Sequence, residues 1–151
     1  MESFENQLVI ERPRAAVFDF VSDFENMPKW NYFVVNVNNV SGEAPALGTR
    51  FHQMRKNDQQ EYEIVEFEPH RRVAIETLPP AQPLTMRFTL ETVDDGTRLT
   101  DRWEFDPEVP GPLAWLATRR VKSAVAENLG KLKELLENGQ VHLQDGRQVT
   151  L

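Results

Sequence analysis

The chain has 151 residues, of which 40% are hydrophobic and 27% are charged, as expected for one folded globular domain. Its 24 acidic and 17 basic side chains give a formal net charge of −7, which disfavours a nucleic-acid partner, and the absence of cysteine excludes disulfides and thiolate chemistry. No stretch approaches the roughly 20 apolar residues of a membrane span, and the start lacks the pattern of a secretion signal, so we expect no stable membrane insertion and a cytoplasmic location.

The first predicted element is a strand over residues 3–13, which Pro13 ends. A short helix over 13–23 and a second helical turn over 25–30 follow it. Six more strands come in quick succession, and they are expected over residues 31–42, 48–57, 59–69, 71–78, 82–93 and 96–107. Their short connections, including the tight-turn sequence Asp94-Asp95-Gly96, predict an antiparallel meander.

The last large element is a helix over about 112–137, with Gly139 just beyond its end. At 1.5 Å per residue it would be about 40 Å long. One face of it is apolar, formed by Ala114, Ala117, Val121, Ala124, Val125, Leu132, Leu135 and Leu136. We therefore expect this helix to be buried on one side along its full length, against the only surface large enough to receive it, which is the sheet. The predicted class is α+β, with a curled seven-stranded antiparallel sheet around the helix.

The two faces that would meet differ in the size of their side chains. The N-terminal half of the helix face is small, whereas the inner strand face is bulky and aromatic, with Phe51, Tyr62, Ile64, Ile75, Met86, Phe88, Trp103 and Phe105. Small residues opposite large ones can simply pack well, or they can leave a cavity. The residue types alone leave both interpretations open.

Three segments resemble those of a known superfamily. They are the opening IERPRAAVFDFVSDFENMPKW, the strand pair YEIVEFEPHRRVAIET and the helix end NLGKLKELLE. Together with the order of elements they resemble the helix-grip fold of the START-like (SRPBCC) superfamily, which includes polyketide cyclase/dehydrase-like proteins and the birch-pollen-allergen group. The resemblance covers residues 1–139 and implies a single domain with an apolar tunnel between sheet and helix for lipids, sterols, polyketides or other hydrophobic molecules.

The tail, residues 140–151, lies beyond that resemblance. Its strand-like halves around Asp145-Gly146 predict a hairpin that docks on the domain, pairs with a second subunit or stays disordered. A homodimer is therefore left open.

A hydrophobic ligand in such a tunnel would contact residues on the inner strand face, the helix and the short helices. Trp30 and Phe33 are expected at its mouth, where the alternative is that they cover the sheet edge. The predicted ligand-binding residues are Trp30, Phe33, Phe51, Tyr62, Ile75, Met86, Phe88, Asp101, Trp103, Ala117, Val121, Ala124 and Asn128.

Two polar residues fall on these inner faces. Asp101 alternates with Leu99 and Trp103, so it should be paired, hydrated or raised in pKa, unless a β-bulge turns it outward. Arg55 is a candidate partner, because it shares a strand face with Phe51, the face we expect to be inward. Asn128 interrupts the apolar helix face and needs a strand side chain, a water molecule or a ligand as partner.

Two main functions fit these residues. One is a carrier of a hydrophobic small molecule without catalysis. The other is a cyclase- or dehydratase-type enzyme in which Asp101 is general acid or base and Arg55 or His52 polarises a carbonyl. A third, a module for a protein partner, would predict a filled core and an apolar outer patch. The sequence shows no cofactor motif, and the three histidines lie far apart, so neither a cofactor nor a metal is expected.

Overall fold

The structure is a computed structural model that describes residues 1–107, 109 and 111–151. Seven strands form its main sheet: β1 (Glu2–Ile10), β2 (Val34–Asn39), β3 (Arg50–Arg55), β4 (Gln59–Glu68), β5 (Arg72–Thr77), β6 (Leu84–Val93) and β7 (Gly96–Phe105). The helical elements are α1 (Arg14–Val21), the 3₁₀ helices η1 (Phe24–Lys29) and η2 (Gly111–Leu113), and α2 (Ala114–Asn138). Strands β8 (Gln140–His142) and β9 (Gln148–Thr150) complete the chain.

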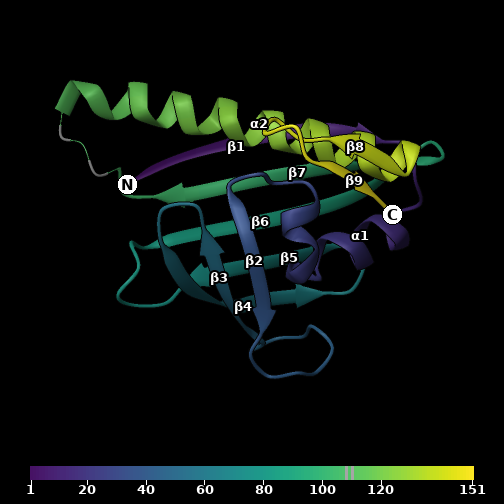
Figure 1. The fold of residues 1–151 in the computed structure, drawn as a ribbon, viewed down its shortest axis with the longest axis horizontal. Coiled ribbons are helices and arrows are strands. Elements are labelled where there is room, and N and C mark those ends of the chain that lie inside the picture. The colour runs from purple at the N-terminus through teal and green to yellow at the C-terminus, as the bar shows by residue number, and fades with distance from the viewer. Residues whose placement is uncertain (108, 110) are drawn as a thin grey trace.

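The main sheet is antiparallel throughout, in the order β1-β7-β6-β5-β4-β3-β2. The strands from β2 to β7 form a meander, and β1 closes the sheet by pairing with β7, where Leu8 lies opposite Leu99. Helix α2 runs along one side of this sheet, above β1 and β7, while α1 and η1 connect β1 to β2 (Figure 1). The predicted helix-grip α+β fold is confirmed.

Alternation along the strands decides which side chains form the core. On β3, Phe51 and Gln53 are buried whereas Met54 is exposed, so the face that we expected to be inward is the inner one. Helix η1 inserts Phe24 into this face, with its ring centroid 5.4 Å from that of Phe51 and 5.7 Å from that of Tyr62. These edge-to-face contacts fix η1 against the sheet.

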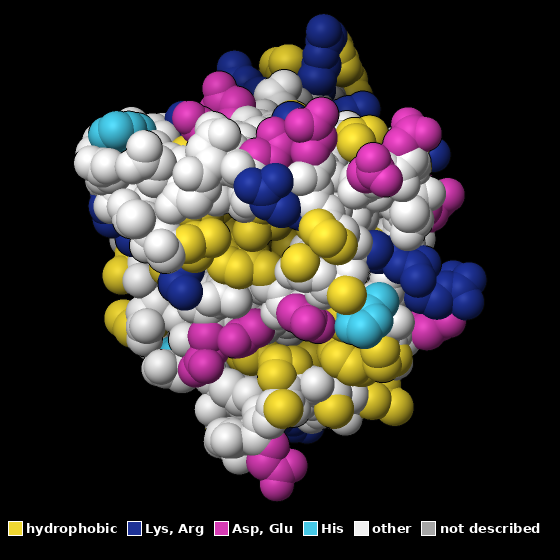
Figure 2. All heavy atoms as spheres, turned by 90° about the vertical axis from the view of Figure 1, so that its right-hand side faces the viewer, with side chains coloured by type: hydrophobic (Ala, Val, Ile, Leu, Met, Phe, Trp, Pro, Cys, Tyr) yellow, Lys and Arg dark blue, Asp and Glu magenta, His cyan; other side chains and the backbone are white. Residues whose placement is uncertain are grey.

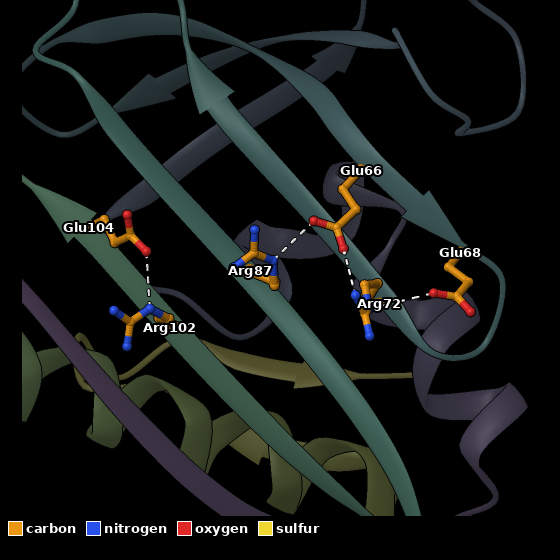
Figure 3. Close-up of polar contacts among 6 residues, drawn as sticks. All are labelled: Glu66, Glu68, Arg72, Arg87, Arg102 and Glu104. Carbon is orange, nitrogen blue, oxygen red and sulfur yellow. Dashed lines mark hydrogen bonds and ion pairs between the residues drawn. The ribbon is translucent and has the colours of Figure 1, made fainter.

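The outer face of the sheet carries charged side chains in pairs. Arg87 and Arg102 are cross-strand neighbours on β6 and β7, a like-charge arrangement that is destabilising on its own. Each guanidinium has an acidic partner, because Arg87 contacts Glu66 at 3.1 Å and Arg102 contacts Glu104 at 3.0 Å (Figure 3). Both signs of charge also intermix on the end of the molecule that Figure 2 shows.

Helix α2 is buried over only part of its length, so the expectation of full-length burial was wrong. Its buried residues are Val125, Asn128, Leu129, Leu132 and Leu135, all from the middle of the helix onward. The N-terminal turns extend past the strands (Figure 1), and Trp115 is 58% exposed there. The helix is longer than the sheet surface beneath it, which an apolar stripe in the sequence cannot reveal.

Residues 140–151 form a hairpin in which β8 pairs with β9. Gly139 ends α2 in the left-handed conformation, with φ of 78° and a hydrogen bond from its N–H to the Leu135 carbonyl, so the chain reverses without a side-chain clash. Val141 and Leu143 are buried, which ties the hairpin to the domain. None of the helices in the described part of the chain combines the length and apolar character of a membrane span.

Candidate functional site

A cavity of about 480 Å³ lies between the sheet, η1 and the middle of α2. Its walls are largely apolar and aromatic, which is usual for a small-molecule site, and its volume lies within the range of such sites. Of the predicted ligand-binding residues, those that line it are Trp30, Phe33, Tyr62, Ile75, Met86, Phe88, Asp101, Trp103, Val121, Ala124 and Asn128. The alternation on the strands and the helical stripe therefore bring most of the predicted set to one space.

Two predicted residues do not line this cavity. Phe51 is fully buried behind the wall, where its ring stacks on that of Tyr62 with 5.6 Å between centroids. Ala117 lies one turn before Val121 on α2, is half-buried and does not line the cavity. Both have the correct parity or periodicity, but Phe51 lies too deep and Ala117 lies one turn too early on the helix to line the cavity.

The two aromatic residues expected at the mouth differ in position. Phe33 is 41% exposed and lies at the rim, whereas Trp30 is only 5% exposed and lies inside. The Trp30 ring is 6.4 Å from that of Phe88, centroid to centroid. Trp30 directly follows the last residue of η1, and the 3₁₀ geometry of η1 sets its depth. The sequence segment that begins in α1 and ends in β2 thus closes one side of the cavity.

Two acidic side chains line the cavity, Asp58 at its exposed end and Asp101 in its wall. Asp101 is buried, with 2% exposure. The Trp103 indole N–H donates to its Oδ2 at 3.2 Å, while its Oδ1 is buried and has no hydrogen-bond partner among the described residues. Burial raises the pKa of Asp101 from its ordinary 3.8 to about 7, and the Trp103 hydrogen bond opposes this shift. The carboxyl is therefore poised to exist in both protonation states near neutral pH.

Arg55, the possible partner of Asp101, and His52, its alternative for polarising a carbonyl, both make other contacts. Arg55 lines the outer part of the cavity but forms a two-point ion pair with Asp58, at 2.7 and 2.6 Å. His52 lies on the opposite face of β3, with its Nε2 3.0 Å from the Gln59 side-chain oxygen. Arg55, one possible partner of Asp101, pairs with Asp58 instead, because the turn after β3 places this acid within reach.

Asn128 is 4% exposed and lines the cavity from α2. Its Oδ1 accepts a hydrogen bond at 3.1 Å from Gln144, in the turn of the β8–β9 hairpin. This partner was missing from the sequence-based alternatives, because a hydrogen bond between α2 and a turn 16 residues later leaves no local pattern. The hairpin is therefore linked directly to a residue of the cavity wall.

The hairpin also contacts the rim through charged side chains. Asp145 lies 3.5 Å from the Lys56 ammonium, which itself is 5.0 Å from the centre of the Tyr32 ring. Arg147 donates to the Pro28 carbonyl of η1 at 2.8 Å. Three separate elements at the mouth, η1, the β3–β4 turn and α2, are thus joined by one short segment.

Other wall residues were not in the predicted set. Gln53 accepts a hydrogen bond from the Tyr62 hydroxyl at 3.1 Å, and burial raises the pKa of that tyrosine above its ordinary value. Met27, from η1, lines the cavity as well. Strand parity places Gln53 correctly, whereas the inward direction of Met27 depends on 3₁₀ geometry. Among the described residues, no group of histidine, aspartate and glutamate side chains is arranged to hold a metal ion.

Comparisons with known proteins place this geometry among related folds. A family model described as polyketide cyclase/dehydrase and lipid transport matches residues 1–137. A comparison with curated proteins gives no match.

Several solved structures share the fold at low sequence identity. Protein MLL2253 from Mesorhizobium loti aligns with a TM-score of 0.73 and 17% identity, over 93% of this chain and 100% of that one. The Aha1 dimer from Colwellia psychrerythraea gives 0.71 and 17%, over 92% and 98%. BexL, a di-domain ARO/CYC from the BE-7585A biosynthetic pathway, gives 0.71 and 19%, over 91% of this chain and 47% of that one.

Proposed function

The chain belongs to the polyketide cyclase/dehydrase and lipid transport family, within the superfamily that its sequence resembles, and from this premise we propose that it binds or carries a hydrophobic small molecule in the cavity between the sheet and α2. The ligand would be of lipid, polyketide or aromatic type. The observation that carries the proposal is the largely apolar cavity of about 480 Å³. Folded proteins usually fill such space, because unfilled apolar volume lowers stability.

The lining favours a ligand with flat or aliphatic apolar surface. Trp30, Tyr62, Phe88 and Trp103 offer ring faces or edges to it, and Ile75 and Met86 fill the spaces between them. Polar groups are sparse and lie at the wall or at the rim, which is how apolar pockets orient a ligand. Binding would gain mainly from removing the ligand's apolar surface from water.

A cyclase- or dehydratase-type activity is the second candidate, and Asp101 is the observation that favours it. A carboxyl with a pKa of about 7 can serve as general acid or base at neutral pH. Catalysis of this type also needs a second group that polarises the substrate carbonyl. Arg55 is held by Asp58 and His52 lies outside the cavity, so the carrier function accounts for more of the geometry.

Titration with the fluorescent probe 1-anilinonaphthalene-8-sulfonate tests the binding proposal. Ala124 lines the cavity, whereas its neighbour Ala126 is exposed on the same helix. We expect Ala124→Trp to weaken probe binding by about tenfold or more, since the indole occupies the space, and Ala126→Trp to leave binding unchanged. Equal binding by both variants, with melting temperatures near that of the wild type, would contradict the proposal.

The enzymatic alternative has a separate test. A ligand recovered from the protein is incubated with the wild type and with Asp101→Asn, and the mixture is followed by mass spectrometry for cyclisation or loss of water. Conversion by the wild type but not by Asp101→Asn would show that the Asp101 carboxyl takes part in catalysis. Binding without conversion by either protein leaves the carrier function.

A further inference from the structure

The N-terminal end of α2 exposes apolar side chains outside the cavity. Leu113, the last residue of η2, is 59% exposed, Trp115 58% and Leu116 38%, and we call these three residues the helix tip. Figure 1 shows this end of α2 projecting past the strands of the sheet. Clustered exposed apolar residues that include a tryptophan mark interaction surfaces more often than plain solvent contact.

Cations outnumber acids on the surface beside the helix tip. Arg119, Arg120 and Lys122, which we call the basic ring, are exposed, and none forms an ion pair with another described residue. One acid, Glu127, shares a surface hollow with Leu116, Arg119 and Arg120, so the three cations exceed it here although the whole chain has a net charge of −7. The opposite end of the molecule, in contrast, mixes acidic and basic side chains (Figure 2).

The helix tip and the basic ring are arranged in sequence along the helix axis. Arg119 and Arg120 follow Trp115 and Leu116 by four residues each, which is about 6 Å of axial rise. On a helical projection all four lie away from the stripe of Val121, Val125 and Asn128 that faces the sheet. An apolar end followed about 6 Å later by cations matches the roughly 5–10 Å depth to which apolar side chains enter the headgroup region of a bilayer.

We propose that the helix tip and the basic ring form a peripheral docking surface for a membrane that contains anionic lipids. The tip enters the boundary between headgroups and acyl chains, and the ring contacts lipid phosphates. This binding is interfacial and reversible, and it does not depend on a ligand in the cavity. Arg120 belongs to both the ring and the cavity lining, so a docked membrane would lie beside one margin of the cavity.

The charge pattern distinguishes a membrane from a second copy of the chain. In a two-fold dimer the same patch meets itself, so three cations of each copy would be brought together with only Glu127 of each copy beside them. A bilayer with anionic headgroups offers opposite charge and an apolar layer at the required depth. The membrane therefore satisfies both parts of the surface.

Vesicle co-sedimentation tests the proposal. The probes are vesicles of phosphatidylcholine alone and vesicles with about one-third phosphatidylglycerol. We expect binding to the anionic vesicles that weakens with salt, and little binding to phosphatidylcholine. Replacing two ring cations, with Arg119→Gln and Arg120→Gln together, should weaken partitioning by about tenfold to thirtyfold. Replacing Trp115 and Leu116 by Ala should cause a loss of similar size.

Controls separate the surface from general charge or hydrophobicity. Leu47→Ala removes a side chain that is 69% exposed elsewhere, and Lys131→Gln removes a cation farther along α2; both should partition like the wild type. Equal binding to the two vesicle types, no binding at all, or equal losses in the controls would overturn the proposal. So would a concentration-dependent dimer that Trp115→Ala dissociates while vesicle binding is absent, because the surface would then bind a second copy.

Discussion

Replacement of Asp101 by asparagine should change how the stability of the protein depends on pH. The carboxyl is 2% exposed and its pKa is raised by burial from 3.8 to about 7. Because the folded state holds the proton more tightly than the unfolded state, the stability gained from this proton is present at low pH and is lost as pH rises toward the folded pKa of about 7. Asparagine keeps an oxygen for the Trp103 N–H but does not titrate in this range.

The size of this effect follows from the two pKa values. Between pH 5.5 and pH 8, a carboxyl with pKa 3.8 unfolded and about 7 folded loses roughly 2 kcal/mol of its contribution to folding. The wild type should therefore lose about 2 kcal/mol more stability over this interval than Asp101→Asn does. The other titrating groups are common to both proteins and largely cancel in the comparison.

Urea unfolding, followed by tryptophan fluorescence at several pH values, measures this difference. The reasoning requires the gap between the two proteins to widen in favour of Asp101→Asn as pH rises. A gap that stays constant within about 0.5 kcal/mol from pH 5.5 to pH 8 would show that Asp101 is hydrated and ionises normally in the folded state.

Two further predictions concern other positions. Asn128→Leu should change the free energy of unfolding by less than about 1 kcal/mol, because the released Gln144 amide is exposed and can turn to water. The same change should speed hydrogen exchange at Val141 and Leu143, since the hairpin loses its contact with α2. A large loss of stability with a fully protected hairpin would contradict this prediction. Gly96→Ala should lower stability by more than about 1 kcal/mol, because the added Cβ would lie 2.8 Å from the Ile10 carbonyl oxygen. The control Gly130→Ala, whose Cβ would meet nothing within 4 Å, should raise stability by roughly 0.5–1 kcal/mol. Equal effects of the two changes in thermal unfolding would refute the close contact between β1 and β7.

Alternation along the strands was the most informative pattern in the sequence. Alternation placed Tyr62, Phe88 and Trp103 on one face, and the register of the sheet brings them to one cavity. Alternation gives the face on which a residue lies but not its depth. It therefore could not show that Phe51 lies behind the cavity wall or that Arg55 lies at the strand end, where it pairs with Asp58.

The helix and the tail were less predictable, for physical reasons. The apolar stripe that includes Ala117 continues beyond the end of the sheet, and periodicity does not record where the partner surface stops. The depth of Trp30 depends on the 3₁₀ geometry of η1. The contact from Gln144 to Asn128 depends on how the hairpin folds back, which no local pattern encodes.

The central claim is that the cavity holds a hydrophobic small molecule, and native mass spectrometry of the purified protein tests it most directly. We expect a bound species that denaturation releases into an organic extract, and we expect it to be absent from Ala124→Trp and present in Ala126→Trp. A wild-type protein that carries no such species, and that binds none from a lipid and polyketide extract under the same conditions, would contradict the account.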